Sequence, residues 1–374
     1  MELKVIHSVE LPFILNLHND VYNTQVNFKG SIYNLELNIS NTKYKVMTKY
    51  QGKDAYIEVE EDEISSLDED ERSNYREKLR TYISWEEKKL FNVTKEMLDN
   101  ISEEVKVDKL KSIILYNEID YENNLTDFSQ AMYTLFNDEE KEELGYSVLI
   151  DTQLSGLSNS DLFLSAINQL IKAYSVFRND FFVEKCTLHT LRGIQVTQFV
   201  DNIQWQGFKR IGKLPPIINK PWLPDISQQE LTDFKNILQN GVEIDPLKSL
   251  VIVSKNLLEK GETRSAIINI SAVLEYSVER KIRTKLLAKG KTAQSIESIL
   301  NATKLNFKDR CNKTLKRATG KSLVTDYPTE WSTVDTLRKK FRHLIAHSVL
   351  EPTYTDTENM IEEFEKVIAI VESL

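Results

Sequence analysis

Hydrophobic and polar positions alternate with a period of two over the first sixty residues, which is typical of half-buried β-strands. Turn-forming residues at 19–20, 29–30 and 51–53 separate the runs. The alternation is carried by three groups of residues: Leu35, Leu37 and Ile39, then Tyr44, Val46, Thr48 and Tyr50, then Ala55, Ile57 and Val59. The pattern predicts an antiparallel sheet or sandwich over residues 1–65.

The next stretch, residues 66–211, gives a mixed pattern. Ser66 or Asp68, within an acidic run, is a candidate N-cap for a helix to about Ile83. Further along, periods near 3.6 predict helices and periods of two predict strands. We expect helices at 125–144 and 158–178, and strands at 146–150, 186–191, 194–199 and 203–208. Residues 1–211 are therefore expected to form a mixed β/α N-terminal region.

Four prolines then fall within ten residues, at 215, 216, 221 and 224. A helix cannot continue through such a run, because proline lacks the backbone N–H and clashes with the preceding turn. We place a linker at 212–228 and a second domain at 229–374.

The hydrophobic pattern of this second domain predicts helices only. The longest, 262–289, carries an apolar stripe at three- and four-residue spacing, and Gly290 ends it. The last helix spaces its apolar residues by 4, 3, 4 and 3 from Met360 to Leu374, as in a bundle. The remaining helices are expected at 246–260, 293–300, 307–318 and 329–349. The predicted fold class is α+β, a β-containing N-terminal region followed by an all-α bundle.

Charge is distributed unevenly along the chain. The whole sequence has 48 basic and 57 acidic residues, a net charge of -9, whereas residues 280–342 hold 17 Lys/Arg against 5 Asp/Glu. Such asymmetry favours a polyanionic partner for the basic segment. Two cysteines without CxxC spacing, no apolar run that would cross a bilayer and no secretory signal lead us to expect a cytoplasmic protein.

The candidate chemistry lies in residues 336–348, which hold two of the five histidines and four consecutive or nearly consecutive cations. RNA cleavage without a metal needs a group that moves the 2′-hydroxyl proton and a cation that stabilises the phosphate. Histidine suits the first task because its pKa is near neutrality, and the planar guanidinium of arginine suits the second. Arg342 and His347 supply both groups, five residues apart.

An arginine, a polar residue, three variable residues and a histidine resemble the motif of the HEPN superfamily, here Arg342 to His347. The stretch 272–275 in the long helix is also similar to that family's second helix. The resemblance covers about residues 230–374. It implies a helical bundle, an endoribonuclease that needs no metal or cofactor, a composite cleft between two protomers, and a role as a toxin or in anti-phage defence.

On this basis we expect His347 to transfer the proton, Arg342 to hold the phosphate and His343 to assist, with Glu275 and Arg338 in support. RNA is the expected substrate and a homodimer the expected assembly. The N-terminal region is expected to bind a trigger ligand or protein, or to restrain the nuclease. Cations expected to guide the RNA backbone are Lys339, Lys340, Lys308, Arg310, Lys313, Lys316 and Arg317.

Other interpretations stay open. On one straight helix, Arg342 and His347 would lie about 140° apart, so one protomer alone would not focus both on one phosphate. An Arg-x4-His pair also arises by chance, and Arg338 with His343 forms a second one. The bundle could bind RNA or a nucleotide without cleaving it, or serve only dimerisation. Zinc held by His343 and His347 lacks a third ligand, and no phosphate-loop or serine-hydrolase motif occurs.

Overall fold

The computed structural model describes the chain as two compact units. Residues described are 1–50, 53–59, 75–116, 125–187, 190–191, 193–211, 223–240, 245–302, 306–342 and 352–374. Unit 1 comprises Met1–Gln169 and Cys186–Asn240, and unit 2 comprises Leu170–Lys185 and Gly241–Leu374. Unit 1 contains an antiparallel sheet with helices, and the described part of unit 2 contains helices and no strand, so the α+β class is confirmed.

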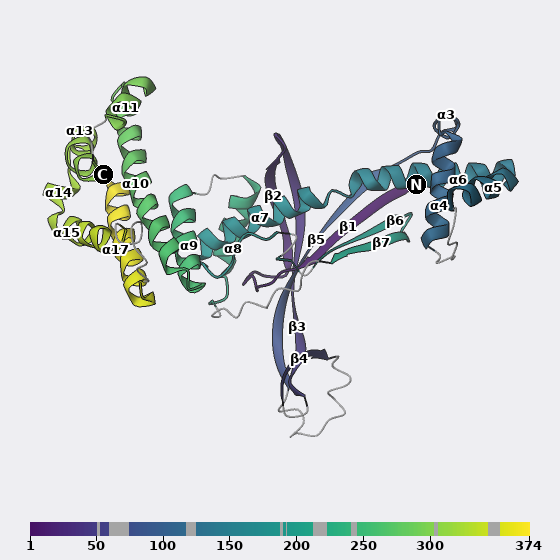
Figure 1. Cartoon of the computed structure of the whole chain (residues 1–374), viewed down its shortest axis with the longest axis horizontal. Coiled ribbons are helices and arrows are strands. Elements are labelled where there is room, and N and C mark those ends of the chain that lie inside the picture. Colours follow the sequence, from purple (N-terminus) through teal and green to yellow (C-terminus); the bar gives the residue numbers. More distant parts are fainter. Residues whose placement is uncertain are drawn as a thin grey trace. The chain divides into compact units, whose positions relative to one another are not determined.

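One antiparallel sheet holds all the described strands of unit 1, in the order β2-β3-β5-β1-β6-β7, with β4 paired to β3 (Figure 1). Its strands are β1 (Glu2–Glu10), β2 (Asp20–Phe28), β3 (Ser31–Tyr50), β4 (Lys53–Val59), β5 (Tyr75–Leu90), β6 (Gly193–Val200) and β7 (Ile203–Ile211). The alternation seen at 35–39 and 44–50 belongs to a single long strand, β3. Strands from both ends of unit 1 meet in this sheet, because β1 pairs with β5 on one side and β6 on the other.

The helix expected up to Ile83 is wrong over residues 75–83, which form part of β5. Here the side chains of Thr81, Ile83 and Trp85 are buried and the positions between them are not. This period of two is that of a β-strand, and β5 pairs with β1 on one side and with β3 on the other. Pairing across the sheet therefore decides the conformation of a segment whose acidic beginning resembled a helix start.

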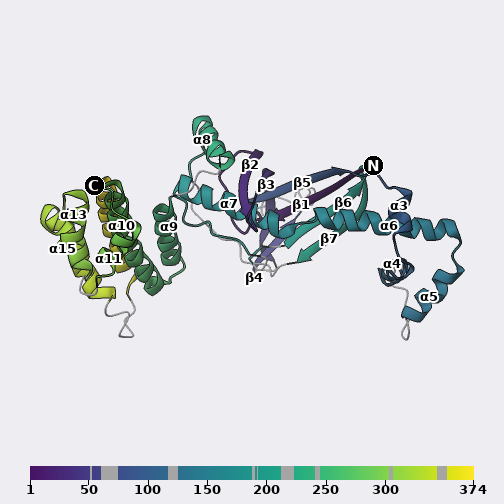
Figure 2. The same cartoon turned by 90° about the horizontal axis from the view of Figure 1, so that it is seen from above.

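Six helices begin in or belong to unit 1: α3 (Lys95–Asp99), α4 (Glu103–Tyr116), α5 (Leu125–Leu135), α6 (Asp138–Leu157), α7 (Ser160–Arg178) and α8 (Gln228–Gln239). A strand at 146–150 is wrong, because these residues continue α6, which a capping box of Asn137 and Glu140 starts. No strand forms in the described part of 186–191. The end of α6 and the beginning of α7 lie alongside the sheet, where Phe163 packs on Trp85 (Figure 2).

Helix α8 was expected in the C-terminal domain but groups with unit 1. It packs on β2 through the Tyr22 and Phe234 rings, 6.1 Å apart, and through a 2.5 Å ion pair between Asp20 and Lys235. The division between the units therefore falls after Asn240, beyond the linker predicted at 212–228. Most of that linker, 212–222, lies outside the described residues.

Unit 2 packs its helices around the long α10, against which α9 and α17 lie side by side (Figure 1). Its helices are α9 (Pro246–Glu259), α10 (Thr263–Ala288), α11 (Ala293–Leu300), α12 (Phe307–Asp309), η1 (Arg310–Thr314), α13 (Leu315–Thr319), α14 (Leu323–Asp326), α15 (Pro328–Leu337), η2 (Arg338–Arg342) and α17 (Tyr354–Ser373). The predicted stripes of α10 and α17 are buried together in one core. Within the residues that the structure describes, no helix combines the length and apolarity needed to span a membrane.

Candidate functional site

The predicted catalytic residues stand at the edge of what the structure describes. The backbone of Arg342 closes η2, whereas its side chain and both histidines, His343 and His347, lie outside the described residues. The zinc alternative for the two histidines therefore lies outside them as well. The described residues nearest in sequence, 328–342, show how this segment is anchored.

The segment starts at α15 with Pro328 in the first helical turn, where a missing N–H costs nothing. Trp331, Val334 and Phe341 are buried in the unit 2 core, where α15 packs on α17 and η2 contacts α10. The straight α-helix expected over 329–349 is wrong at 338–342, which form a π-helical turn. Such a turn shifts the 3.6-residue phase between Arg338 and Arg342. The angle of about 140° between Arg342 and His347 concerns residues 343–347, which lie outside the described residues.

Arg338 is fixed by contacts inside unit 2. Its guanidinium Nη2 donates a hydrogen bond to Glu275 Oε1 on α10, and its side chain is only 12% exposed. The same guanidinium lies 3.8 Å from the centre of the Phe307 ring, at cation–π distance. The support expected from Glu275 and Arg338 is thus an ion pair between two helices, not a group presented to solvent.

A second π-helical turn, η1, packs against α10 as η2 does. Short π turns in longer helices are frequent at functional sites, and here two of them contact the same helix. Cys311 of η1 is fully buried, and burial raises the pKa of its thiol. The thiolate form needed for nucleophilic attack is therefore suppressed at neutral pH, which excludes Cys311 as a reactive group.

Four of the seven predicted RNA-guiding cations already have partners in the protein. Lys339 pairs with Asp335 at 2.6 Å and Lys340 with Asp356 at 3.3 Å. Lys313 pairs with Asp309 at 3.1 Å, while Arg310 is half-buried and donates to a backbone carbonyl, that of Leu300. The three ion pairs lower the charge available to a bound polyanion, whereas the hydrogen bond of Arg310 holds its side chain against the protein.

The other three, Lys308, Lys316 and Arg317, are exposed and have no carboxylate at ion-pair distance among the described residues. Four further cations also have no carboxylate at ion-pair distance among the described residues: Lys289, Lys291 and Lys321, which are exposed, and Lys285, which is half-buried. The sequence analysis counted these four in the +12 segment but assigned them no role. They differ from Lys339 and Lys340 in having no carboxylate within ion-pair distance among the described residues, which only the three-dimensional structure shows.

Comparison of the chain with protein-family models, with curated proteins and with solved structures returned no match. Nor do any three histidine, cysteine, aspartate or glutamate residues gather as a metal site within the described ranges. The described part of unit 2 therefore combines two features. The basic π-helical turn η2 is bound to the central helix α10 through Arg338 and Glu275, and several cations have no carboxylate at ion-pair distance among the described residues.

Proposed function

We propose that this protein is a metal-independent endoribonuclease of HEPN type that acts as a homodimer in toxin-like or anti-phage defence. RNA is the proposed substrate because its 2′-hydroxyl is the internal nucleophile that such chemistry uses. The active site would be composite, with the same segment from each protomer facing one scissile phosphate.

This proposal rests on the contacts that Arg338 makes within unit 2. The sequence offers two overlapping Arg-x4-His pairs, and the structure commits the first arginine to Glu275. Arg342 and His347 are therefore the pair to which the proposal assigns chemistry. The 2′-oxygen bonds to phosphorus as the bond from phosphorus to the 5′-oxygen breaks, and His347 transfers the proton from the 2′-hydroxyl to the leaving 5′-oxygen. Arg342 stabilises the charge on the phosphate, and His343 supplies an auxiliary polar contact.

The test is cleavage of a mixed cellular RNA pool in EDTA by the full chain, with the wild type compared with Arg342→Ala and His347→Ala. Each substitution is expected to reduce the rate by at least 10²-fold, the usual effect of losing a positioned acid, base or charge donor. Lys248→Gln, on the exposed side of α9, is a matched control for lost charge and should keep the wild-type rate.

Sedimentation of each variant at the same concentration checks that the dimer persists. Cleavage that survives both substitutions would place the chemistry outside the Arg–His segment. A wild-type dimer that binds RNA and leaves it intact would instead support the second candidate, a non-catalytic RNA-binding bundle.

One specific observation favours that second candidate. Arg338, which also stands five residues before a histidine, is paired with Glu275 inside unit 2. If Arg342 has a comparable internal role, the basic surface remains and the catalysis does not. Metal-independent cleavage distinguishes the two candidates directly.

A further inference from the structure

Several cations of unit 2 that have no carboxylate at ion-pair distance among the described residues lie where α10 and α13 end. Lys289, near the end of α10, donates from its Nζ to the backbone oxygen of Arg317 on α13, at 2.9 Å. Lys316 of α13 and Lys321, just after it, both act on the carboxylate of Asp326. We define the α10–α13 basic patch as Lys285, Lys289, Lys291, Lys316, Arg317 and Lys321.

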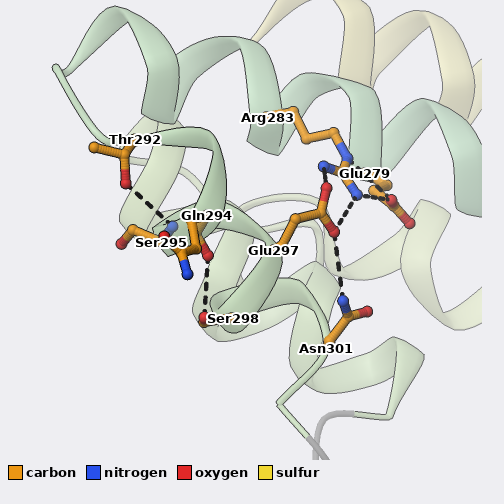
Figure 3. Close-up of polar contacts among 8 residues, drawn as sticks. All are labelled: Glu279, Arg283, Thr292, Gln294, Ser295, Glu297, Ser298 and Asn301. Atoms are coloured by element: carbon orange, nitrogen blue, oxygen red, sulfur yellow. Dashed lines mark hydrogen bonds and ion pairs between the residues drawn. The ribbon is translucent and has the colours of Figure 1, made fainter.

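Nearby carboxylates are occupied by other groups. Glu279 and Glu297 both bind Arg283, which ties α11 to α10 (Figure 3). Because of these bonds the pKa of Arg283 is raised, and the pKa of Glu297 is lowered by the same guanidinium. These two acids are therefore already paired with a cation outside the patch.

Asp326 is an acid that lies beside the patch, near Lys316 and Lys321. It accepts hydrogen bonds from the backbone N–H of Ser322, at 2.7 Å, and from the hydroxyl of Thr325, at 3.0 Å. These bonds, the backbone one first, and then the charges of Lys316 and Lys321 lower its pKa. This carboxylate lies near Lys316 and Lys321, two of the six patch cations, so the patch keeps a positive excess.

The positive charge of the patch also affects Lys281, which lies next to it in α10. Burial, and next the charge of Lys285, lowers the pKa of Lys281, whose Nζ donates to the backbone oxygen of Glu372. The fold places these cations close together, and the repulsion between them favours the binding of an anion from outside the protein.

Helix dipoles alone do not account for six cations. The carbonyl ends of α10 and α13, which stop at glycines with positive φ, attract a cation in the last turn. That interaction stabilises by about 0.3–1 kcal/mol per helix end and is satisfied by one or two side chains. Lys291 and Lys321 lie beyond the ends of their helices and gain little from it.

We propose that the α10–α13 basic patch binds the phosphate backbone of the RNA on which the Arg–His segment acts. The inference rests on the proposed function for its ligand, but it assigns the binding to residues outside that segment. The proposed path of the RNA runs along α10. It extends from Glu275, which lies beside Arg338, to Lys289. Fourteen residues of α-helix span about 21 Å, which corresponds to roughly six nucleotides at 3.4 Å each.

The experiment measures binding separately from cleavage. A fluorescent 12-nucleotide RNA with 2′-O-methyl groups at all positions lacks the nucleophile, so the full chain can bind it without cutting it. Fluorescence anisotropy between 50 and 300 mM KCl gives the affinity and its salt dependence. A DNA strand of the same sequence, and vesicles of phosphatidylserine and phosphatidylcholine, are titrated in parallel.

Two double variants test the patch from its two sides, Lys289→Gln with Arg317→Gln, and Lys285→Gln with Lys291→Gln. Each lost phosphate contact lowers the slope of log affinity against log salt by about 0.7, so each double variant should lower it by about 1.4. At 0.15 M salt this corresponds to roughly tenfold weaker binding. A trinucleotide should bind the wild type and both variants about equally, because it is too short for the path.

Lys248→Gln with Lys366→Gln is the matched control, since it removes the same charge from α9 and α17, with Lys366 paired to Glu363 at 2.5 Å. This control should retain the wild-type slope. Equal slopes for the patch variants and the control would overturn the inference, as would binding to the vesicles but to neither oligonucleotide. Patch-dependent binding together with uncut cellular RNA would retain the inference and refute the nuclease.

Discussion

A histidine in the centre of the unit 1 sheet makes the stability of that unit depend on pH. His7 of β1 is fully buried between Trp85 of β5 and Phe163 of α7, with ring centroids 4.9 and 5.5 Å away. Neither ring nitrogen has a hydrogen-bond partner among the described residues. Burial lowers the pKa of His7 from 6.5 to about 4.

The direction of the effect follows from proton binding. Between pH 6.5 and 4 the unfolded chain binds a proton at His7 and the folded chain does not, so the unfolded state is favoured as the pH falls. The stabilisation is complete above pH 6.5 and is lost at about 1.4 kcal/mol per pH unit, roughly 3 kcal/mol in total by pH 4. Replacing His7 removes this dependence.

We would compare the wild type with His7→Leu and His7→Phe, measuring urea unfolding from pH 4 to 7.5 by hydrogen exchange of peptides from β1. On acidification from pH 7.5 to 4, the unfolding free energy of the wild type should fall by about 3 kcal/mol more than that of either variant. This holds even if the two variants differ in absolute stability. The matched control is His18→Gln, at an exposed position of the same unit. If the wild-type and His7-variant curves stay parallel over this range, His7 is not buried in its neutral form and the reasoning is wrong.

Three further predictions concern packing and backbone. Glu275→Gln should destabilise unit 2 by about 2–3 kcal/mol in thermal unfolding, because it removes the carboxylate that pairs with a largely buried guanidinium; a change below about 0.5 kcal/mol would show that solvent replaces the pair. Phe364→Ala, at a fully buried position of α17, should cost about 3–5 kcal/mol, whereas the exposed Glu362→Ala should stay within about 0.5 kcal/mol. Gly320→Ala should cost about 1–2 kcal/mol since its φ is +91°, while Gly156→Ala in α6, with open space around it, should be neutral or stabilising; equal effects would contradict a backbone origin.

The functional assignment combines features of different kinds. Sequence motif and charge suggested the chemistry, and the structure showed which arginine is already bound within the fold. It also separated cations with acidic partners, such as Lys339 and Lys340, from those without, such as Lys316 and Arg317. This separation depends on side chains from different helices, so no count along the chain could have produced it.

Sequence by itself determined the elements whose periodicity is strong and local. The stripe of α10, the spacing of α17, the turn at Gly290 and the alternation in β3 follow from side chains that each element must bury on one face. It also determined the location of the candidate motif and of the basic segment, since both are properties of residue order.

Tertiary structure alone decided the assignments that depend on distant partners. Residues 75–83 became a strand because β1 and β3 supply the hydrogen bonds, and α8 joined unit 1 because β2 offers its apolar side chains a surface. Likewise Arg338 is a structural residue only because Glu275, 63 positions earlier, faces it across two helices. Periodicity records what a segment must bury, but the group that it is buried against is fixed only when the chain folds.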